Sequence, residues 1–318
     1  MLPAYARQTT ERFWQPDHGA KQRIQRLVAD FSIEITPATA SRHVALADLL
    51  PAGTRVYIAF VPGEDHRSVA ATAARVRTAR LVPVPHFPAR SIVDRAQLDD
   101  YLRRVTVEAA VDEVLVIGGG TDLPRGAFAG TWSLLETGLF EAYGIRVIGL
   151  AGHPEGQRQL CAPAAATTLE QKLGYVRQTS AEVRLVTQFM FEAEPLFAWE
   201  RMIRAQGSDL PIHVGVPGPA TLRSLLSYAR LCGVGNSMRV LTRHAGNLLK
   251  LASLSFPDAL LAALARHRGD DPDCRLERLH FYPFGGLARS ARWIEAIRAG
   301  DFTLHDDGLG FTVHDAAG

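Results

Sequence analysis

Cysteine, net charge and long apolar runs are all scarce in this sequence of 318 residues. The three cysteines form no CxxC pair and cannot all be bridged to one another, so a reducing compartment fits best. The 35 basic and 33 acidic residues leave a formal charge of +2, which gives little net field to hold nucleic acid. No apolar run approaches the roughly 18 residues that span a bilayer, and the N-terminus lacks the apolar core of a signal peptide. We therefore expect a cytoplasmic protein without nucleic-acid or membrane partners.

What the sequence does contain is enough apolar material for a sizeable core, 47% of its residues, in a regular rhythm. Short β-rich runs alternate eight times with longer amphipathic segments, which is typical of parallel βα units. Strands are predicted at 31–36, 55–60, 80–87, 113–119, 145–152, 183–191, 211–217 and 276–284. Because these runs are apolar through most of their length, they suit strands buried on both faces. Eight of them close most naturally into a single (β/α)8 TIM barrel.

One domain is expected to cover the whole chain, 1–318, with the barrel core at about 30–300. Within the N-terminal extension, 1–30, an extra helix is predicted from about residue 12 that closes the bottom of the barrel. Additional helices are predicted at 235–268, before strand eight. The last residues, 306–318, are expected to form a short tail. No internal repeat, low-complexity tract or linker interrupts this plan.

The stretch "VLVIGGGTDLPRG", 114–126, is a candidate for a dinucleotide-binding turn because it carries three glycines after an apolar run. A Rossmann fingerprint requires G-x-G-x-x-G, but its third glycine would fall at Leu123, and Pro124 follows where the helix should already run. The fingerprint therefore fails. In a barrel, the same glycines come just past the end of strand four, on the face where barrel active sites are built. Small residues there allow a flat ligand to approach the backbone.

Polar side chains collect at this same predicted mouth. They are Glu34 on strand one, His86 after strand three, Asp122 after strand four, His153 and Glu155 after strand five, Gln188 on strand six and Tyr282 on strand eight. Barrel strands carry mostly Val, Ile and Leu inward, so Glu34 and Gln188 need partners or ligands. Structural readings stay open: a carboxylate tied to an arginine for Glu34, a satisfied core amide for Gln188, a loop cap for His86, and a simple tight turn for the glycines.

Five segments together resemble the methylenetetrahydrofolate reductase family in its bacterial form, which has only the catalytic domain. They are "FSIEITP", "TDLPRG", "GLAGHPEG", "VTQFMFE" and "HFYPF", in the family's order and at the matching strands across roughly 30–290. The resemblance implies a barrel that holds FAD at its mouth. It also implies interconversion of 5,10-methylenetetrahydrofolate and 5-methyltetrahydrofolate with NADH or NADPH, as part of one-carbon metabolism and methionine biosynthesis. The small-molecule substrate would be a tetrahydrofolate derivative.

The resemblance assigns catalytic roles to Glu34 and Asp122. Glu34 matches the general acid that protonates folate as its ring opens to an iminium, and burial at an apolar strand end would help it hold that proton. Asp122 matches an aspartate near the flavin and the pterin. A carboxylate there can accept hydrogen bonds from the N–H groups of the pterin. Gln188 matches a glutamine that contacts folate and nicotinamide in turn. Tyr282, in the matching strand-eight segment, is expected in the substrate site.

The resemblance also implies a cofactor site. Its residues are His86, Gly119, Gly120, Asp122, Ala151, Gly152, His153, Gln171 and Lys172, and no metal is expected. Some segments depart from the family. The run "GGGTD" is one residue longer than usual and lacks the family's arginine, His153 stands where many members have tyrosine, and "TTLEQKLGYVRQ" replaces a lysine-rich helix. These departures fall on cofactor contacts more than on catalytic ones.

Other functions remain open from the sequence. A relative without flavin could transfer hydride directly from NADH or NADPH, and another could bind pterin or flavin without turnover. A metal-dependent barrel hydrolase could use His86, His153, Glu155 and His280 as ligands, although strand one has no H-x-H pair to start such a site. The choice between NADH and NADPH, the direction of the reaction and self-association as a homo-oligomer are not encoded in a readable pattern.

Overall fold

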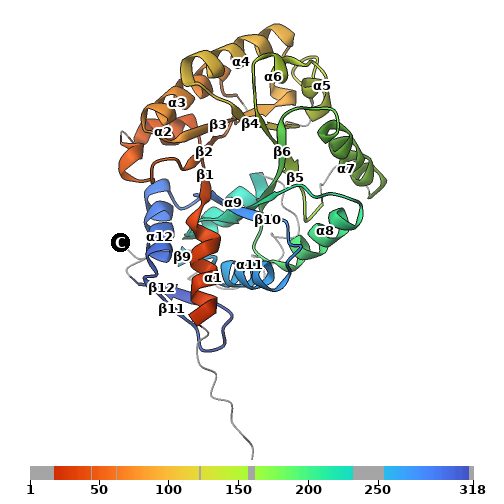
Figure 1. Cartoon of the computed structure of the whole chain (residues 1–318). Coiled ribbons are helices and arrows are strands. Elements are labelled where there is room, and N and C mark those ends of the chain that lie inside the picture. The colour runs from red at the N-terminus through yellow and green to blue at the C-terminus, as the bar shows by residue number, and fades with distance from the viewer. Residues whose placement is uncertain are drawn as a thin grey trace, which may run out of the picture.

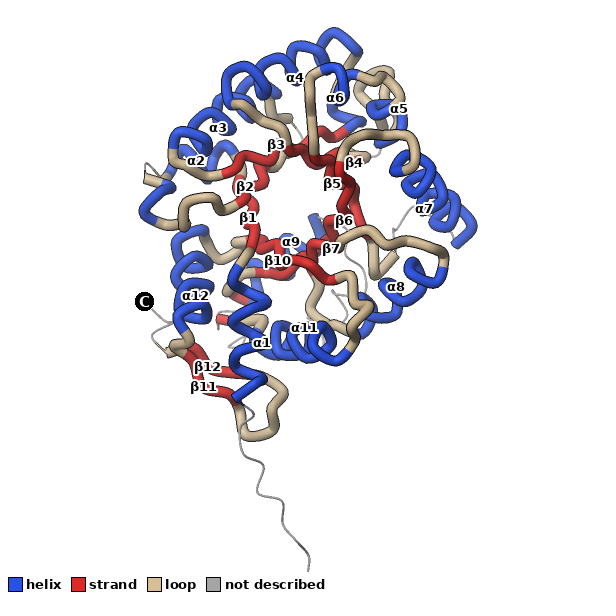
Figure 2. The backbone as a smooth tube through the Cα atoms, viewed as in Figure 1, coloured by secondary structure: helices blue, strands red, loops and turns tan. Residues whose placement is uncertain are grey.

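A closed ring of eight parallel strands forms the centre of the molecule, with helices around it (Figures 1 and 2). The order around the ring is β1-β10-β7-β6-β5-β4-β3-β2. The strands are β1 Phe31–Ile35, β2 Arg55–Ile58, β3 Val82–Pro88, β4 Glu113–Ile117, β5 Val147–Gly152, β6 Glu182–Phe189, β7 Ile212–Pro217 and β10 Leu276–Tyr282. Each of the eight strands begins and ends within two residues of its predicted run. The predicted (β/α)8 TIM barrel is confirmed.

The computed structural model describes residues 18–43, 45–61, 63–121, 123–156, 162–231 and 254–314. Its helices are α1 His18–Ala29, α2 Pro37–Arg42, α3 His66–Thr78, α4 Arg95–Ala109, α5 Thr131–Leu135, α6 Leu139–Ala142, α7 Ala162–Val176, α8 Glu194–Ala205, α9 Leu222–Leu231, α11 Asp258–Asp270 and α12 Leu287–Ala299, with short 3-10 helices η1 Leu46–Asp48 and η2 Ala89–Ser91. Within these ranges, none of the helices has the length and hydropathy needed to cross a bilayer.

Two details at the ends of the chain differ from expectation. The N-terminal helix α1 does not lie across the barrel opening; it packs beside the ring against α11 and α12, where Lys21 donates to the Phe302 carbonyl and Gln25 to the Arg298 carbonyl (Figure 2). The expected C-terminal tail includes the second strand of an antiparallel hairpin, β11 Phe302–Leu304 and β12 Phe311–Val313. Both segments contact α11 and α12, and their apolar side chains, such as Ile24, Phe302 and Phe311, belong to the core.

The segment before strand eight carries an additional helix, as predicted. Both α9 and α11 lie between β7 and β10, and a two-stranded sheet of β8 Ala220–Thr221 and β9 Leu254–Ser255 accompanies them. The first part of the predicted 235–268 helical region lies outside the described residues, whereas α11 matches its end. The structure therefore confirms more than one helix in this connection.

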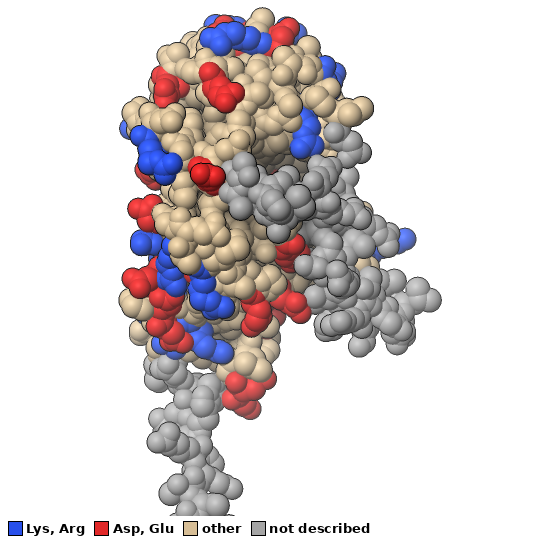
Figure 3. Space-filling model, turned by 90° about the vertical axis from the view of Figure 1, so that its right-hand side faces the viewer, with Lys and Arg blue, Asp and Glu red and all other residues tan. Residues whose placement is uncertain are grey.

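Two apolar layers hold the barrel together. The larger core lies between the outer faces of the strands and the helices, and it includes Ile33, Val116 and Trp293. A smaller cluster inside the ring contains Tyr57, Val84, Leu115 and Val186. Inward and outward residues alternate along each strand, so the apolar layer inside the ring separates two polar levels, one at each end. On the face drawn in Figure 3, basic and acidic side chains are interspersed among the described residues.

Candidate active site

Glu34 lies at the C-terminal end of β1 between two imidazoles. Its Oε2 atom is 3.6 Å from His86 Nε2 on β3 and 3.8 Å from His280 Nε2 on β10. The Glu34 side chain is 20% exposed, whereas the two histidine side chains are 7% and 0% exposed. Neither Nε2 atom has a hydrogen-bond partner. The carboxyl group therefore faces the open end of the barrel, and its nearest polar neighbours come from two other strands.

The hydrogen bonds of His280 determine which of its nitrogens carries the proton. The Ser32 hydroxyl lies 3.0 Å from His280 Nδ1 and donates to the Leu279 carbonyl at 3.3 Å. Since a hydroxyl has a single proton, Ser32 accepts from Nδ1–H of His280. The Nε2 atom of a neutral His280 then has a lone pair toward Glu34. A carboxyl group that carries a proton is the complementary partner for that lone pair.

His86 is neutral because it is buried. Burial lowers the pKa of the His86 imidazole to about 4, although the charge of Glu34 opposes this shift and that of His280 adds to it. Tyr57 packs edge-on to His86, with ring centroids 6.1 Å apart, and tilted against His280 at 4.4 Å. This apolar ring contact limits the access of water to the pair of histidines. Glu34 therefore has a neutral imidazole, that of His86, as one of its two nearest polar neighbours.

The structural alternative for Glu34, a carboxylate tied to an arginine, describes a different residue. Glu113, at the opposite end of the barrel interior, accepts from Arg55 Nε at 2.8 Å and lies 3.4 Å from Arg184 Nη2. Arg278, at that same end, pairs with Asp30. Arginine and carboxylate groups thus neutralise each other where the strands begin, while Glu34 faces histidines where the strands end. Barrel chemistry is built at the strand ends, so this placement favours a functional carboxyl.

A bulge in β6 presents Gln188 at the mouth. The register between β6 and β7 shifts between Val186 and Phe189. Thr187 stabilises the irregularity, because its hydroxyl accepts from Gly215 N at 2.8 Å and donates to the Gln188 carbonyl at 2.9 Å. Gly215 is required there, since a Cβ atom would come within 2.4 Å of the Gln188 carbonyl oxygen. Gln188 itself is half-buried.

An aromatic wall continues from this bulge. Tyr282 donates its hydroxyl to the Thr187 carbonyl at 3.0 Å, and its ring packs edge-on to His280 and to Phe189. Phe284 stacks on Tyr282 at 5.7 Å and on the half-exposed Tyr228 of α9 at 4.2 Å. Of these aromatic residues only Tyr282 was predicted in the site, although the aromatic runs "FMF" and "HFYPF" are visible in the sequence. Stacked rings of this kind bind flat heteroaromatic ligands.

The glycine turn after β4 is shaped by a residue that the sequence analysis missed. Gly119 has φ +94°, and a Cβ atom there would lie 3.2 Å from Pro88. Arg90, from η2 after β3, donates to the Thr121 carbonyl at 2.7 Å and to the Ala129 carbonyl at 3.3 Å. An arginine is therefore beside the turn, although it comes from another strand end. Gly120 has open space around it, and Asp122 lies outside the described residues.

The remaining predicted cofactor residues meet at the end of β5. Lys172, buried on α7, donates to the Ala151 carbonyl at 2.5 Å, and burial lowers the pKa of its ammonium to about 8. Burial, followed by the charge of Lys172, lowers the pKa of the half-buried His153 to about 4. Trp199 of α8 packs so closely on Gly152 that a Cβ atom would lie 3.0 Å away. Gln171 is exposed.

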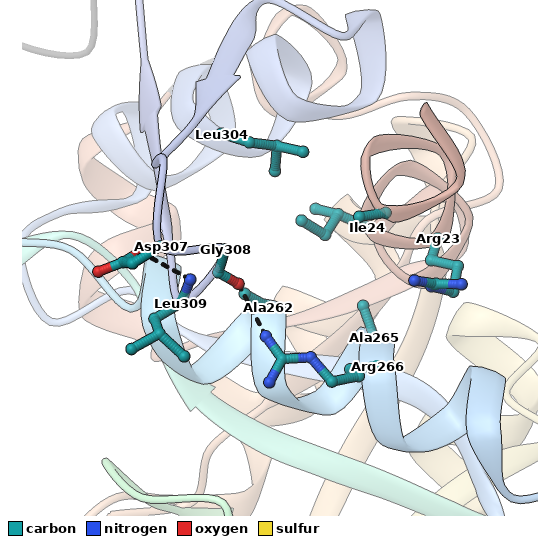
Figure 4. Close-up of a pocket in the computed structure, with 10 residues that line it drawn as sticks. Arg23, Ile24, Ala262, Ala265, Arg266, Leu304, Asp307, Gly308 and Leu309 are labelled. Atoms are coloured by element: carbon teal, nitrogen blue, oxygen red, sulfur yellow. Dashed lines mark hydrogen bonds between the residues drawn. The ribbon is translucent and has the colours of Figure 1, made fainter. Parts of the chain in front are cut away.

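The structure therefore gathers most of the predicted residues on one end of the barrel. Glu34, His86, Gln188 and Tyr282 lie on strands β1, β3, β6 and β10, and the glycine turn and the β5 group lie across β4 and β5. Within the described residues, the one set of three metal-ligating side chains does not include His86, His153, Glu155 or His280. A pocket of about 270 Å³ between α1, α11 and the hairpin shares no residue with this site (Figure 4).

No family model matches the chain. Among solved structures, its fold is similar to that of an uncharacterized protein from Clostridium thermocellum that binds two copies of 5-methyl-5,6,7,8-tetrahydrofolic acid. The two are 10% identical, with a TM-score of 0.51 over 88% of this chain and 98% of that chain. The carboxyl transferase domain of Rhizobium etli pyruvate carboxylase is 9% identical, with a TM-score of 0.39 over 71% of this chain and 40% of that chain. The first likeness supports the barrel fold.

Proposed function

We propose that this protein is an oxidoreductase that interconverts 5,10-methylenetetrahydrofolate and 5-methyltetrahydrofolate with NADH or NADPH, through bound FAD. The observation that carries the proposal is Glu34, a carboxyl group that lies between two imidazoles at the mouth of the barrel. Its segment is one of the five that resemble methylenetetrahydrofolate reductases. The similar barrel from Clostridium thermocellum binds 5-methyl-5,6,7,8-tetrahydrofolic acid, which supports a folate as the ligand.

Glu34 would act as the general acid. Reduction of the methylene bridge requires that one of its two C–N bonds break first, and protonation of the departing nitrogen makes that break possible. A proton on Glu34 would have the lone pair of His280 Nε2, 3.8 Å away, as a neighbour. After proton transfer the carboxylate faces Nε2 of His86 and of His280, the two nearest groups that can return a proton from solvent. In the reverse direction the same carboxylate would accept the proton.

The pterin would lie between the aromatic wall and the glycine turn. The Gln188 side chain can both donate and accept, so it suits a folate and a nicotinamide that occupy the mouth in turn. Tyr282, Phe284 and Phe189 offer ring faces and edges to a flat ligand. Asp122, which lies outside the described residues, would accept from the pterin amino and ring N–H groups.

The residues at the ends of β3, β4 and β5 fit a flavin. Nε2 of His86 is buried without a partner, Gly120 leaves open space above the backbone, and Lys172 brings a buried ammonium beside Ala151. His86, His153, Gly119 and Gly152 would border the ring system, and Lys172 with Gln171 would hold its phosphates. The chemistry that FAD supplies when bound is storage of a hydride between nicotinamide and folate.

The first experiment is the visible absorption spectrum of freshly purified protein, followed by assay of NADH and NADPH oxidation with 5,10-methylenetetrahydrofolate. We expect a flavin spectrum, release of FAD on heating, and folate-dependent turnover. Turnover by a colourless protein that does not bind added FAD would replace the flavin relay with direct hydride transfer. Absence of folate-dependent turnover with bound FAD would contradict the proposed reaction.

Direct hydride transfer is the second candidate, and one observation favours it. Arg90 stands beside the glycine turn, but its Nη1 and Nε atoms already donate to the Thr121 and Ala129 carbonyls. A guanidinium used this way stabilises the turn and has less capacity to bind a pyrophosphate. The isotope label of [4-²H]NADH distinguishes the two routes, because direct transfer retains deuterium fully in the methyl group when the protein is free of FAD.

A further inference from the structure

A second group of polar side chains lies at the other end of the barrel, between α8 and α11, which are neighbours in the outer layer (Figure 1). Glu200 of α8, His267 of α11 and Asp271, the C-cap of α11, each offer one ligand atom, and these atoms lie within 4.8 Å of one another. The backbone N–H of Arg275, just before β10 begins, donates to Glu200 Oε1 at 3.3 Å. The group is therefore near the start of the strands, away from the mouth.

Two atoms in this group are buried without partners. Glu200 is 0% exposed, yet its Oε2 atom makes no hydrogen bond. His267 Nε2 is also buried and unpartnered. The His267 ring stacks on Phe197, with centroids 3.9 Å apart, so its direction is fixed by packing. A buried carboxylate oxygen without a partner costs free energy, and a cation between the two atoms would remove that cost.

Arg204 neutralises only part of the group. Its Nη2 atom is 2.9 Å from Asp271 Oδ2, and its Nε atom is 3.7 Å from Glu200 Oε1. Asp271 Oδ1 also accepts from the backbone N–H of Asp273 at 2.9 Å. These contacts orient both carboxylates and leave Glu200 Oε2 without a charge partner. One guanidinium thus stands against two carboxylates, and the remaining negative charge suits a cation.

We propose that Glu200, His267 and Asp271 bind one Zn²⁺ ion that joins α8 to the C-terminal end of α11. A ligand set of carboxylate oxygens and an imidazole nitrogen suits zinc, whereas Ca²⁺ and Mg²⁺ prefer oxygen ligands alone. The ion would lie near the end of the barrel where the strands begin. This position indicates a structural role, because the active sites of barrel enzymes lie at the opposite end. This site is independent of the proposed reaction.

The test uses untagged full-length protein, stripped of metal with EDTA and dialysed. Titration with ZnCl₂, followed by elemental analysis after desalting, is expected to give one zinc per chain. At zinc about 100-fold above the dissociation constant, the melting temperature is expected to rise by roughly 5 °C. MgCl₂ at the same concentration is expected to leave it unchanged. No retained zinc and no thermal shift in the unmodified protein would overturn the proposal.

Three variants locate the ion. Glu200→Gln and His267→Gln remove a buried ligand each, and Asp271→Asn removes a half-buried one whose loss is easier to tolerate. Each is expected to lose both the bound zinc and the thermal shift. His305→Gln, on the exposed hairpin, is the matched control and is expected to keep both. Retention of one zinc by a folded Asp271→Asn protein, with the same thermal shift, would place the ion elsewhere and overturn the assignment.

Discussion

Glu34 has neighbours that differ in kind from those of the other inward-facing glutamate. Glu113 is held by Arg55 and Arg184, so its negative charge is neutralised by permanent cations. Glu34 faces Nε2 of His86 and of His280, which become cationic only by taking a proton. A carboxylate beside arginines is fixed as an anion, whereas one beside neutral imidazoles can exchange a proton with them. This contrast is the reason to assign proton transfer to Glu34.

Replacement of Glu34 by glutamine tests this assignment. The amide keeps the size of the side chain but cannot transfer a proton, so we expect turnover of 5,10-methylenetetrahydrofolate to fall by roughly 10²- to 10⁴-fold. Oxidation of NADH or NADPH by an artificial acceptor is expected to change less than about 2-fold, because that half-reaction needs no folate proton. The two rates are measured by stopped-flow absorbance. Glu295→Gln, on the exposed surface of α12, is the control. Equal loss in both half-reactions would indicate a structural role for Glu34.

At the scale of elements, the β6 bulge positions Gln188 and depends on a glycine in the next strand. Gly215→Ala would place a Cβ atom 2.4 Å from the Gln188 carbonyl oxygen and 2.6 Å from that of Thr187. Since backbone atoms on both sides must move, we expect a loss of about 1 to 3 kcal/mol in the free energy of unfolding. Folate binding should weaken as Gln188 shifts. Urea unfolding and fluorescence titration measure the two effects.

The matched control for this substitution is Gly130→Ala. A Cβ atom at Gly130 meets nothing within 4 Å, so the substitution costs only the weaker N-cap of α5, about 0.5 to 1 kcal/mol, and folate affinity is expected to stay within experimental error of the unmodified protein. A Gly215→Ala protein of normal stability and normal folate affinity would show that the bulge can relax without moving Gln188. The prediction that the β6 bulge is needed to position Gln188 would then be wrong.

The strands could be predicted well because a strand buried on both faces leaves a continuous apolar run, as "VLVI" at 114–117 and "VIGLAG" at 147–152 do. The bulge could not be predicted, since an apolar run does not show which residue is the extra one. The C-terminal hairpin was missed because its strands have three residues each. Glu34 and His86 could be found from their place at strand ends. Arg90 could not, because its partners are backbone carbonyls of a turn that is distant in sequence.

At the scale of the whole molecule, polar groups occupy both ends of the barrel interior and an apolar layer separates them. His213 of β7 belongs to the polar level at the end of the barrel where the strands begin. Its buried ring lies 3.7 Å from Glu277 and 3.5 Å from the Tyr57 hydroxyl. Burial lowers the pKa of His213 to about 4, as it does for His86 at the end where the strands finish. Folding therefore requires that imidazoles at both levels stay neutral, which couples the stability of the barrel to pH.

The direction in which stability changes with pH follows from the ordinary and the folded pKa values of the buried histidines. The ordinary histidine pKa is 6.5, and the folded values are about 4, so between these limits the unfolded chain binds protons that the folded protein does not. The free energy of unfolding is therefore expected to fall as pH drops from 6.5 to 4. His86, His153 and His213 together give a slope of about 3 to 4 kcal/mol per pH unit near pH 5.

Urea unfolding in steps from pH 7 to pH 5 measures this slope. Hydrogen bonding to His213 lowers the pKa of Glu277 to about 2, so this carboxyl adds to the slope mainly below its ordinary value of 4.5. His213→Gln removes one of the three protons that His86, His153 and His213 take up on unfolding, so the slope near pH 5 should fall by about a third. His305→Gln, on the exposed hairpin, should leave it unchanged. A slope that is the same in His213→Gln as in the unmodified protein would mean that the buried imidazole of β7 does not titrate between the two states.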